Sequence, residues 1–169
     1  TYLKALGLLK DKNLKENDKI ERVLALCEQA PFLRRKLFEH MQENGIAIEK
    51  RFFETLPFEE MVDLLWYVDP MVYDITTSRE PLVRYVAMAR GLVPYAPQDA
   101  DVPFALDIMM RLRTLEFTKA TVGFEYVCRE CKQIFPIHFY RCPQCHSVHT
   151  ASIQSKLIQT ENEENISFL

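Results

Sequence analysis

The sequence predicts a mainly α fold, in which a helical hairpin bundle or an array of degenerate helical repeats precedes a small β module. Three observations support this prediction. Only four of the 169 residues are glycine, which disfavours an all-β or loop-rich chain. Apolar residues recur at helical spacing through residues 1–122. From Gly123 the chain becomes rich in β-forming and aromatic residues instead.

The first helices are predicted from their capping residues and their apolar periodicity. Asp18 and Glu21 have the spacing of a capping box at the start of one helix. Pro31 suits the first turn of the next helix, and Gly45 is expected to end it. A short helical segment is predicted over residues 46–54.

The later helices have similar signals. One begins after Pro57, and another begins at Pro81 and ends at Gly91. The stretch 93–97 contains two prolines and must interrupt the helices. Asp101 is expected to cap a last helix that runs to about residue 119.

Paired helices of this length raise the possibility of tetratricopeptide-like repeats. A period of about 34 residues is not evident, and the similar segments Ala30-Pro31 and Leu56-Pro57 lie 26 residues apart. An irregular bundle and a degenerate repeat array therefore both remain open.

Three parts are predicted along the chain. Residues 1–122 form a helical interaction domain, and residues 123–158 form a two- or three-stranded ribbon. Residues 159–169 are polar and are expected to form a flexible tail.

Four of the five cysteines form two Cys-x-x-Cys pairs, with ten residues between the pairs. A two-residue spacer lets a tight turn direct both sulfur atoms of a pair at one point, and the longer link returns the chain to that point. Four thiolates around one tetrahedral Zn²⁺ are the expected result. The sequence thus predicts one structural zinc ion per chain, held by Cys128, Cys131, Cys142 and Cys145. Bound iron, two redox-active dithiols and a pair of disulfides are the alternatives.

Residues 126–150 resemble the rubredoxin-type zinc ribbon that ends members of the lipopolysaccharide assembly protein B family. The matching features are Tyr126, both cysteine pairs and the gap between them, the aromatic pair Phe139-Tyr140, and Thr150. The resemblance implies that the four cysteines are metal ligands and that the ribbon packs against tetratricopeptide repeats. It also implies an adaptor at the cytoplasmic face of the inner membrane that helps regulate lipopolysaccharide synthesis through a membrane protease.

The chain departs from the pattern of that family at three positions. Lys132 and His146 stand where such ribbons place glycine after each cysteine pair, at positions with positive φ. Each is expected to cost about 1 kcal/mol. His149 stands where the family usually has tryptophan. The docking surface of the ribbon is therefore expected to differ.

Several other residues are candidates for a function. His138, His146 and His149 suggest a second metal site or a pH sensor, and exposed ribbon side chains are the favoured alternative. The run Arg34-Arg35-Lys36 suggests nucleic acid or anionic lipid, although a solvated helix face is favoured.

The remaining candidates are an apolar cysteine and a group of aromatic residues. Cys27 lies on an apolar helix face and is expected to be a core thiol. The aromatic residues suit either a partner groove or the core: Trp66, Tyr67, Tyr73 and Tyr85.

Composition narrows the function classes. The net charge of -3 and the pI of about 5.8 make nucleic-acid binding unlikely. Reduced cysteine pairs suit a reducing compartment, so a cytoplasmic location is expected, and the resemblance implies a bacterial source. The chain begins at Thr1 rather than methionine. A preceding segment that tethers it to the cytoplasmic face of the inner membrane is therefore an expectation.

No catalytic motif is evident, and a zinc ion with four cysteine ligands leaves no open position for a substrate. The sequence therefore predicts a non-enzymatic adaptor or assembly factor whose helical domain binds a protein partner. A nucleic-acid-binding zinc ribbon, with Arg129, Lys132 and Arg141 contacting phosphates, is the alternative.

Overall fold

The computed structural model describes residues 1–53, 55–95, 101–117 and 119–160. Two compact units divide the chain. The first contains Thr1–Leu64 and Val68–Asp74, and the second contains Leu65–Tyr67 and the chain from Ile75 onward. The domain boundary predicted after residue 122 stays a prediction, but α-helices and the sheet occur together in the second unit.

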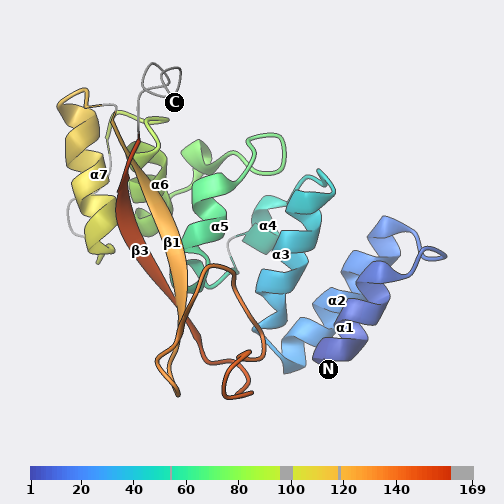
Figure 1. Ribbon diagram of the computed structural model, residues 1–169. Coiled ribbons are helices and arrows are strands. Elements are labelled where there is room, and N and C mark those ends of the chain that lie inside the picture. The colour runs from blue at the N-terminus through green and yellow to red at the C-terminus, as the bar shows by residue number, and fades with distance from the viewer. Residues whose placement is uncertain (54, 96–100, 118, 161–169) are drawn as a thin grey trace, which may run out of the picture. The chain divides into compact units, whose positions relative to one another are not determined.

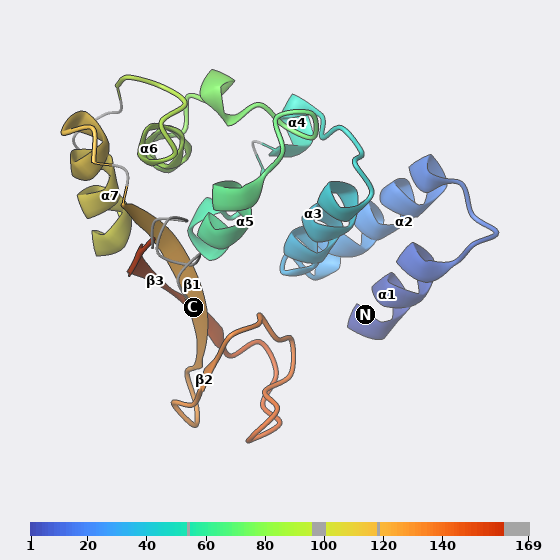
Figure 2. The same ribbon diagram turned by 45° about the horizontal axis from the view of Figure 1, so that its top comes forward.

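The first unit begins with three helices, α1 (Tyr2–Lys10), α2 (Glu16–Gln29) and α3 (Leu33–Glu43), which lie side by side (Figures 1 and 2). Short elements follow: α4 (Lys50–Phe53), a 3₁₀ turn at Phe58–Glu60, and α5 (Val62–Tyr67), which the division between the units crosses. The helix lengths do not repeat, and no repeating helix pair emerges within the described ranges.

Three aromatic side chains join the mainly aliphatic core of the first unit. Phe38 and Phe53 are fully buried, and the Phe53 ring stacks on Tyr73 with 3.5 Å between the ring centroids. Cys27 is also buried, which confirms its prediction as a core thiol, and burial raises the pKa of that thiol. An apolar site of this kind disfavours the thiolate.

A buried ion pair joins α3 to α5 within the first unit. Two guanidinium nitrogens of Arg35 donate to the two carboxylate oxygens of Asp63 at 2.8 and 2.7 Å, and Arg35 also donates to the Glu60 carbonyl. Both side chains are at least nine-tenths buried. The middle residue of the basic run is therefore not on a solvated face, because its charge is paired inside the protein.

The second unit combines helices with an antiparallel sheet. A 3₁₀ turn at Ile75–Thr77 leads into α6 (Pro81–Ala89), and α7 (Phe104–Thr114) follows. The sheet has the order β2-β1-β3, with β1 at Ala120–Cys128, β2 at Ile134–Phe135 and β3 at Ala151–Gln159. α7 packs against α6, β1 and β3 (Figure 1).

The long pairing of β1 with β3 makes the prediction of a mainly α fold wrong. These strands form a continuous ladder from Ala120–Gln159 to Cys128–Ala151, so the sheet is a substantial part of the unit. The helices are also shorter than predicted, because α4 covers only four residues and α7 ends at Thr114. Helices and sheet together describe the fold.

Helix ends were predicted well where glycine marks them. Gly45 and Gly91 have φ angles of 64° and 77° just after α3 and α6, as Schellman-type ends require. The predicted caps were wrong, since α2 begins at Glu16, before Asp18, and Pro103 rather than Asp101 precedes α7. The tail predicted from residue 159 begins inside β3, and residues 161–169 lie outside the described part of the chain.

Candidate metal centre

Two similar turns present the four cysteines. In the first, the Lys132 amide donates to the Cys128 carbonyl at 2.9 Å, and in the second the His146 amide donates to the Cys142 carbonyl at 3.0 Å. The amide of the first cysteine in each turn also donates a hydrogen bond. Cys128 donates to the Gln133 carbonyl, and Cys142 donates to the Ser147 carbonyl. We call these turns, residues 128–133 and 142–147, the two knuckles.

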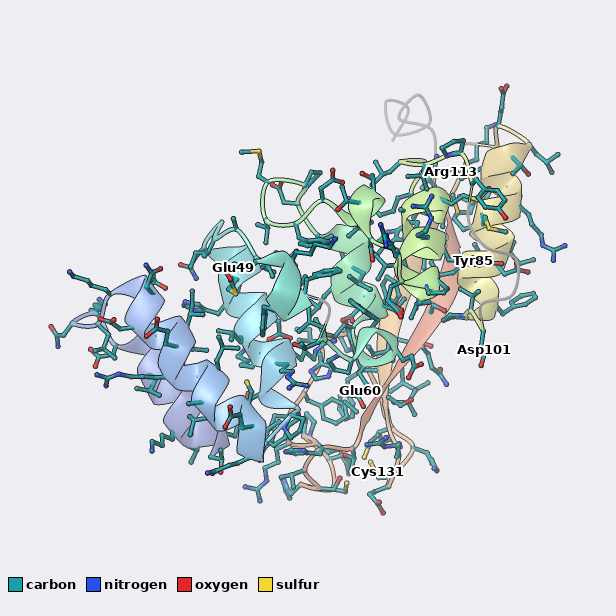
Figure 3. All side chains as sticks on the ribbon, turned by 180° about the vertical axis from the view of Figure 1, so that it is seen from behind. Glu49, Glu60, Tyr85, Asp101, Arg113 and Cys131 are labelled. Atoms are coloured by element: carbon teal, nitrogen blue, oxygen red, sulfur yellow. The ribbon has the colours of Figure 1, made fainter. Side chains whose placement is uncertain are left out.

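The knuckles bring all four predicted ligands together. The Sγ atoms of Cys128, Cys131, Cys142 and Cys145 all lie within 4.8 Å of one another and could hold a metal ion. The Cys128–Cys145 and Cys131–Cys142 sulfur pairs are each 3.7 Å apart. This separation is far longer than the ~2.05 Å of a disulfide. Figure 3 shows sulfur atoms gathered beside Cys131, and Figure 2 shows the knuckle loops at the end of the strands away from α7.

Aromatic side chains pack against the buried cysteines of the site. The leading cysteine of each knuckle, Cys128 and Cys142, is fully buried, whereas Cys145 is exposed. The leading cysteines share a small core with Tyr126 and Phe139, against which further apolar side chains pack. One side of the site is therefore shielded from water and the other is accessible.

Hydroxyl groups lie within bonding distance of two of the sulfur atoms. Thr150 Oγ1 is 3.3 Å from Cys128 Sγ, and Ser147 Oγ is 3.0 Å from Cys145 Sγ. The two hydroxyl oxygens are 2.9 Å apart. Thr150 is buried, and its carbonyl accepts from the Arg129 amide at 2.8 Å, so this residue also joins the first knuckle to the start of β3.

These contacts shift the acidity of the thiols. Burial opposes ionisation of Cys128, but hydrogen bonds from Thr150 and Ser147 and from two backbone amides lower its pKa to about 5. Hydrogen bonds at Ser147 lower the pKa of Cys145. A hydrogen bond from the Gln133 backbone amide lowers the pKa of Cys131. Burial and the neighbouring sulfur atoms outweigh this bond and raise that pKa to about 12. The neighbouring sulfur atoms therefore oppose ionisation of Cys131, and a bound cation would offset that effect.

The structure confirms the predicted positive φ angles after each cysteine pair. Lys132 and His146 both have φ of 62°, a region that side chains with a Cβ rarely adopt. Each residue therefore introduces local backbone strain that glycine would not.

Replacing Lys132 and His146 with glycine is expected to stabilise the knuckles by about 1 kcal/mol each. Slower hydrogen exchange of the amides in residues 120–159 would show this gain. Lys132→Ala and His146→Ala remove the same side chains but keep the Cβ, so they should give no gain. Equal protection in the glycine and alanine variants would contradict the strain.

The other candidates in this region have separate environments. His146 and His149 are exposed, and His138 is half-buried with an edge contact to Tyr126. The His149 ring meets Tyr140, and burial lowers its pKa. Within the described ranges no histidine joins the metal-ligand group, which contains cysteines alone.

The basic side chains of the knuckles bond to nearby carbonyl groups. Arg129 donates to the His149 carbonyl, Lys132 to the Arg129 carbonyl, and Arg141 to the His146 carbonyl at 3.2 Å. All three side chains remain exposed. They therefore hold the backbone of the knuckles together while their charges face solvent.

The aromatic candidates divide between core and surface. Trp66, Tyr73 and Tyr85 are buried, and Tyr67 is exposed with an edge contact to Phe124. No single groove is therefore supported by the four residues.

Sequence reasoning missed the role of Ser147, and it noted Thr150 only as a matching position. Both residues lie within five positions of Cys145 in the sequence, and both hydroxyl groups reach Cys128 Sγ, while Ser147 Oγ also reaches Cys145 Sγ. A polar residue just beyond a cysteine pair was the available signal.

Comparisons with protein family models, curated proteins and solved structures found no match to this chain. In the described ranges, none of the helices combines the length and apolar character needed to cross a membrane.

Proposed function

We propose that this chain is a non-enzymatic adaptor whose cysteine cluster holds one structural Zn²⁺ ion and whose surface binds a protein partner. The spacing of the four sulfur atoms carries the proposal. Thiolates at the corners of a tetrahedron, each about 2.3 Å from Zn²⁺, lie about 3.8 Å apart. Two of the sulfur pairs are 3.7 Å apart, and none of the separations exceeds 4.8 Å.

The chemistry of the cluster supports a structural role for the metal. Four cysteine ligands fill the coordination shell of Zn²⁺, so a substrate water has no position on the ion. The ion would neutralise the thiolates that otherwise raise the pKa of Cys131. It would also join two knuckles whose cysteine pairs are ten residues apart in the chain, which contributes free energy to folding.

Exposed apolar side chains near the knuckles support a protein partner. Ile134, Ile137 and Val148 are 57%, 74% and 52% exposed. Apolar residues with a charged rim are typical of the surfaces that proteins use to bind one another. The resemblance to adaptor zinc ribbons and the preference of free thiols for a reducing compartment support a cytoplasmic location for the proposed interaction.

Nucleic-acid binding is the second candidate, because Arg129, Lys132 and Arg141 are exposed on the knuckles. Their charges could contact phosphate groups. The net charge of -3 for the whole chain opposes this function, since phosphate binding usually needs a basic excess.

Metal content and captured partners test the proposal together. Protein purified without added metal should contain one zinc ion per chain and should lose β structure when a strong chelator removes it. Iron would give a coloured protein and would replace zinc in the proposal. A chain that has no bound metal after purification and after zinc addition would contradict it.

A paired surface variant tests the partner. Ile137→Asp should reduce capture of the cytoplasmic protein that co-purifies with the wild type, because it places a charge on the apolar part of the knuckle region. Leu3→Asp is the matched control, since Leu3 is 80% exposed but belongs to the first unit. Co-purifying nucleic acid whose release depends steeply on salt would instead favour the second candidate.

A further inference from the structure

Two hydroxyl groups make the four sulfur atoms of the cluster unequal. Ser147 and Thr150 approach only Cys128 and Cys145, at distances from 3.0 to 3.5 Å. The other two sulfur atoms, those of Cys131 and Cys142, contact each other at 3.7 Å. In the described part of the chain, Ser147 and Thr150 therefore contact one pair of sulfur atoms and not the other.

We propose that Ser147 and Thr150 are positioning residues that each donate one hydrogen bond to a metal-bound thiolate, Ser147 to Cys145 and Thr150 to Cys128. The proposal rests on the metal site proposed above. The two hydrogen bonds would strengthen metal binding and would protect the exposed sulfur of Cys145.

Counting protons selects this pattern of donors. With a metal bound, all four sulfur atoms are thiolates that accept hydrogen bonds and donate none. Ser147 and Thr150 then supply two protons for four possible contacts, three to sulfur and one between the hydroxyl groups, and the nearest sulfur of each is Cys145 at 3.0 Å and Cys128 at 3.3 Å. A charged acceptor binds a proton donor more strongly than a neutral hydroxyl does. Both protons are therefore directed at sulfur.

The surroundings favour a built arrangement over a chance contact. Thr150 is buried, and its carbonyl is bonded to the Arg129 amide, so its hydroxyl is held next to Cys128. The Ser147 carbonyl accepts from the Cys142 amide at 2.8 Å, which fixes Ser147 against the second knuckle. These backbone hydrogen bonds hold both residues beside the sulfur atoms. Outer groups of this kind tune the ligands of metal sites in general.

The arrangement has a specific consequence for Cys145. This cysteine is the only exposed member of the cluster, so solvent and electrophiles reach it first. A hydrogen bond from Ser147 withdraws electron density from the sulfur and lowers its nucleophilicity. Ser147 therefore protects the most accessible ligand from alkylation and from loss of the metal.

Ser147→Ala in the full chain tests the inference with two measurements on zinc-loaded protein. Competition with a chromogenic chelator should show about tenfold weaker zinc binding, the lower end for loss of a group behind a metal ligand. Iodoacetamide labelling, resolved by mass spectrometry, should show Cys145 reacting several-fold faster, with less change at Cys131. Thr150→Val should weaken zinc binding similarly, with its larger effect at Cys128.

Conservative variants separate hydrogen bonding from packing. Ser147→Thr and Thr150→Ser keep a hydroxyl donor and should retain zinc affinity near that of the wild type. Ser155→Ala removes a hydroxyl from β3 opposite Phe124 and should change neither measurement. Equal zinc affinity and equal Cys145 labelling in Ser147→Ala and Ser155→Ala would overturn the inference alone. A wild-type chain that binds no zinc would overturn the proposed metal site and this inference with it.

Discussion

In competition with a chelator that leaves the wild type loaded, the Cys142→Ser variant should lose its zinc and its knuckles should become disordered, while most of the helical signal remains. Cys142 is fully buried beside Phe139, and its sulfur lies 3.7 Å from that of Cys131. Structural zinc contributes about 10–16 kcal/mol in small zinc modules, so one of four ligands accounts for about 3–4 kcal/mol. The expected loss of zinc affinity is therefore about a hundredfold to a thousandfold.

Metal analysis, far-ultraviolet circular dichroism and hydrogen exchange check this result together. Protection should disappear in residues 128–150 first, because this segment depends on the metal for its closure. Cys27→Ala is the control, since Cys27 is buried in α2 and belongs to the first unit. Unchanged zinc stoichiometry in Cys142→Ser would contradict the ligand assignment.

Asp63→Ala should destabilise the first unit by about 3–5 kcal/mol, the usual loss when one partner of a buried ion pair is removed. The side chain of Arg35 is 10% exposed, and its guanidinium would lose two charge-assisted hydrogen bonds to Asp63. The physical cause is that a buried cation would lose its two-pronged carboxylate partner, while the 3.2 Å contact of its Nε with Glu39 remains. Urea unfolding followed through the helical signal would measure the loss.

Two further variants define the origin of that loss. The double variant Arg35→Met with Asp63→Leu removes both charges and should recover much of the stability. Lys36→Ala breaks the partly exposed ion pair with Glu39 and should cost less than about 1 kcal/mol. A cost for Asp63→Ala as small as that of Lys36→Ala would show that the buried pair contributes little.

The metal-ligand group was predictable from the sequence because its geometry is mostly local. The two residues between paired cysteines allow only tight turns, and the structure brings all four sulfur atoms together as expected. The positive φ at Lys132 and His146 was predictable for the same reason. The identity of the ion and the function of the protein stay predictions.

Features that depend on distant residues were not predictable. Asp63 is 28 positions from Arg35, so nothing near the basic run indicated that Arg35 would be buried. The packing of α7 against β1 and β3 likewise depends on segments that periodicity treats separately. The end of α7 was missed because Glu116 takes the φ of 56° that glycine usually marks.

The ladder between β1 and β3 ends at the cysteine cluster, because Cys128 is the last residue of β1 and pairs with Ala151. Antiparallel strands can slip along each other, and a slip of one residue would turn every side chain to the opposite face. Such a slip would also move Cys128 about 3.4 Å along the strand, which would withdraw its sulfur from the other three. An ion held by all four cysteines would therefore fix the alignment of the two strands as far as Ala120, at the opposite end of β1.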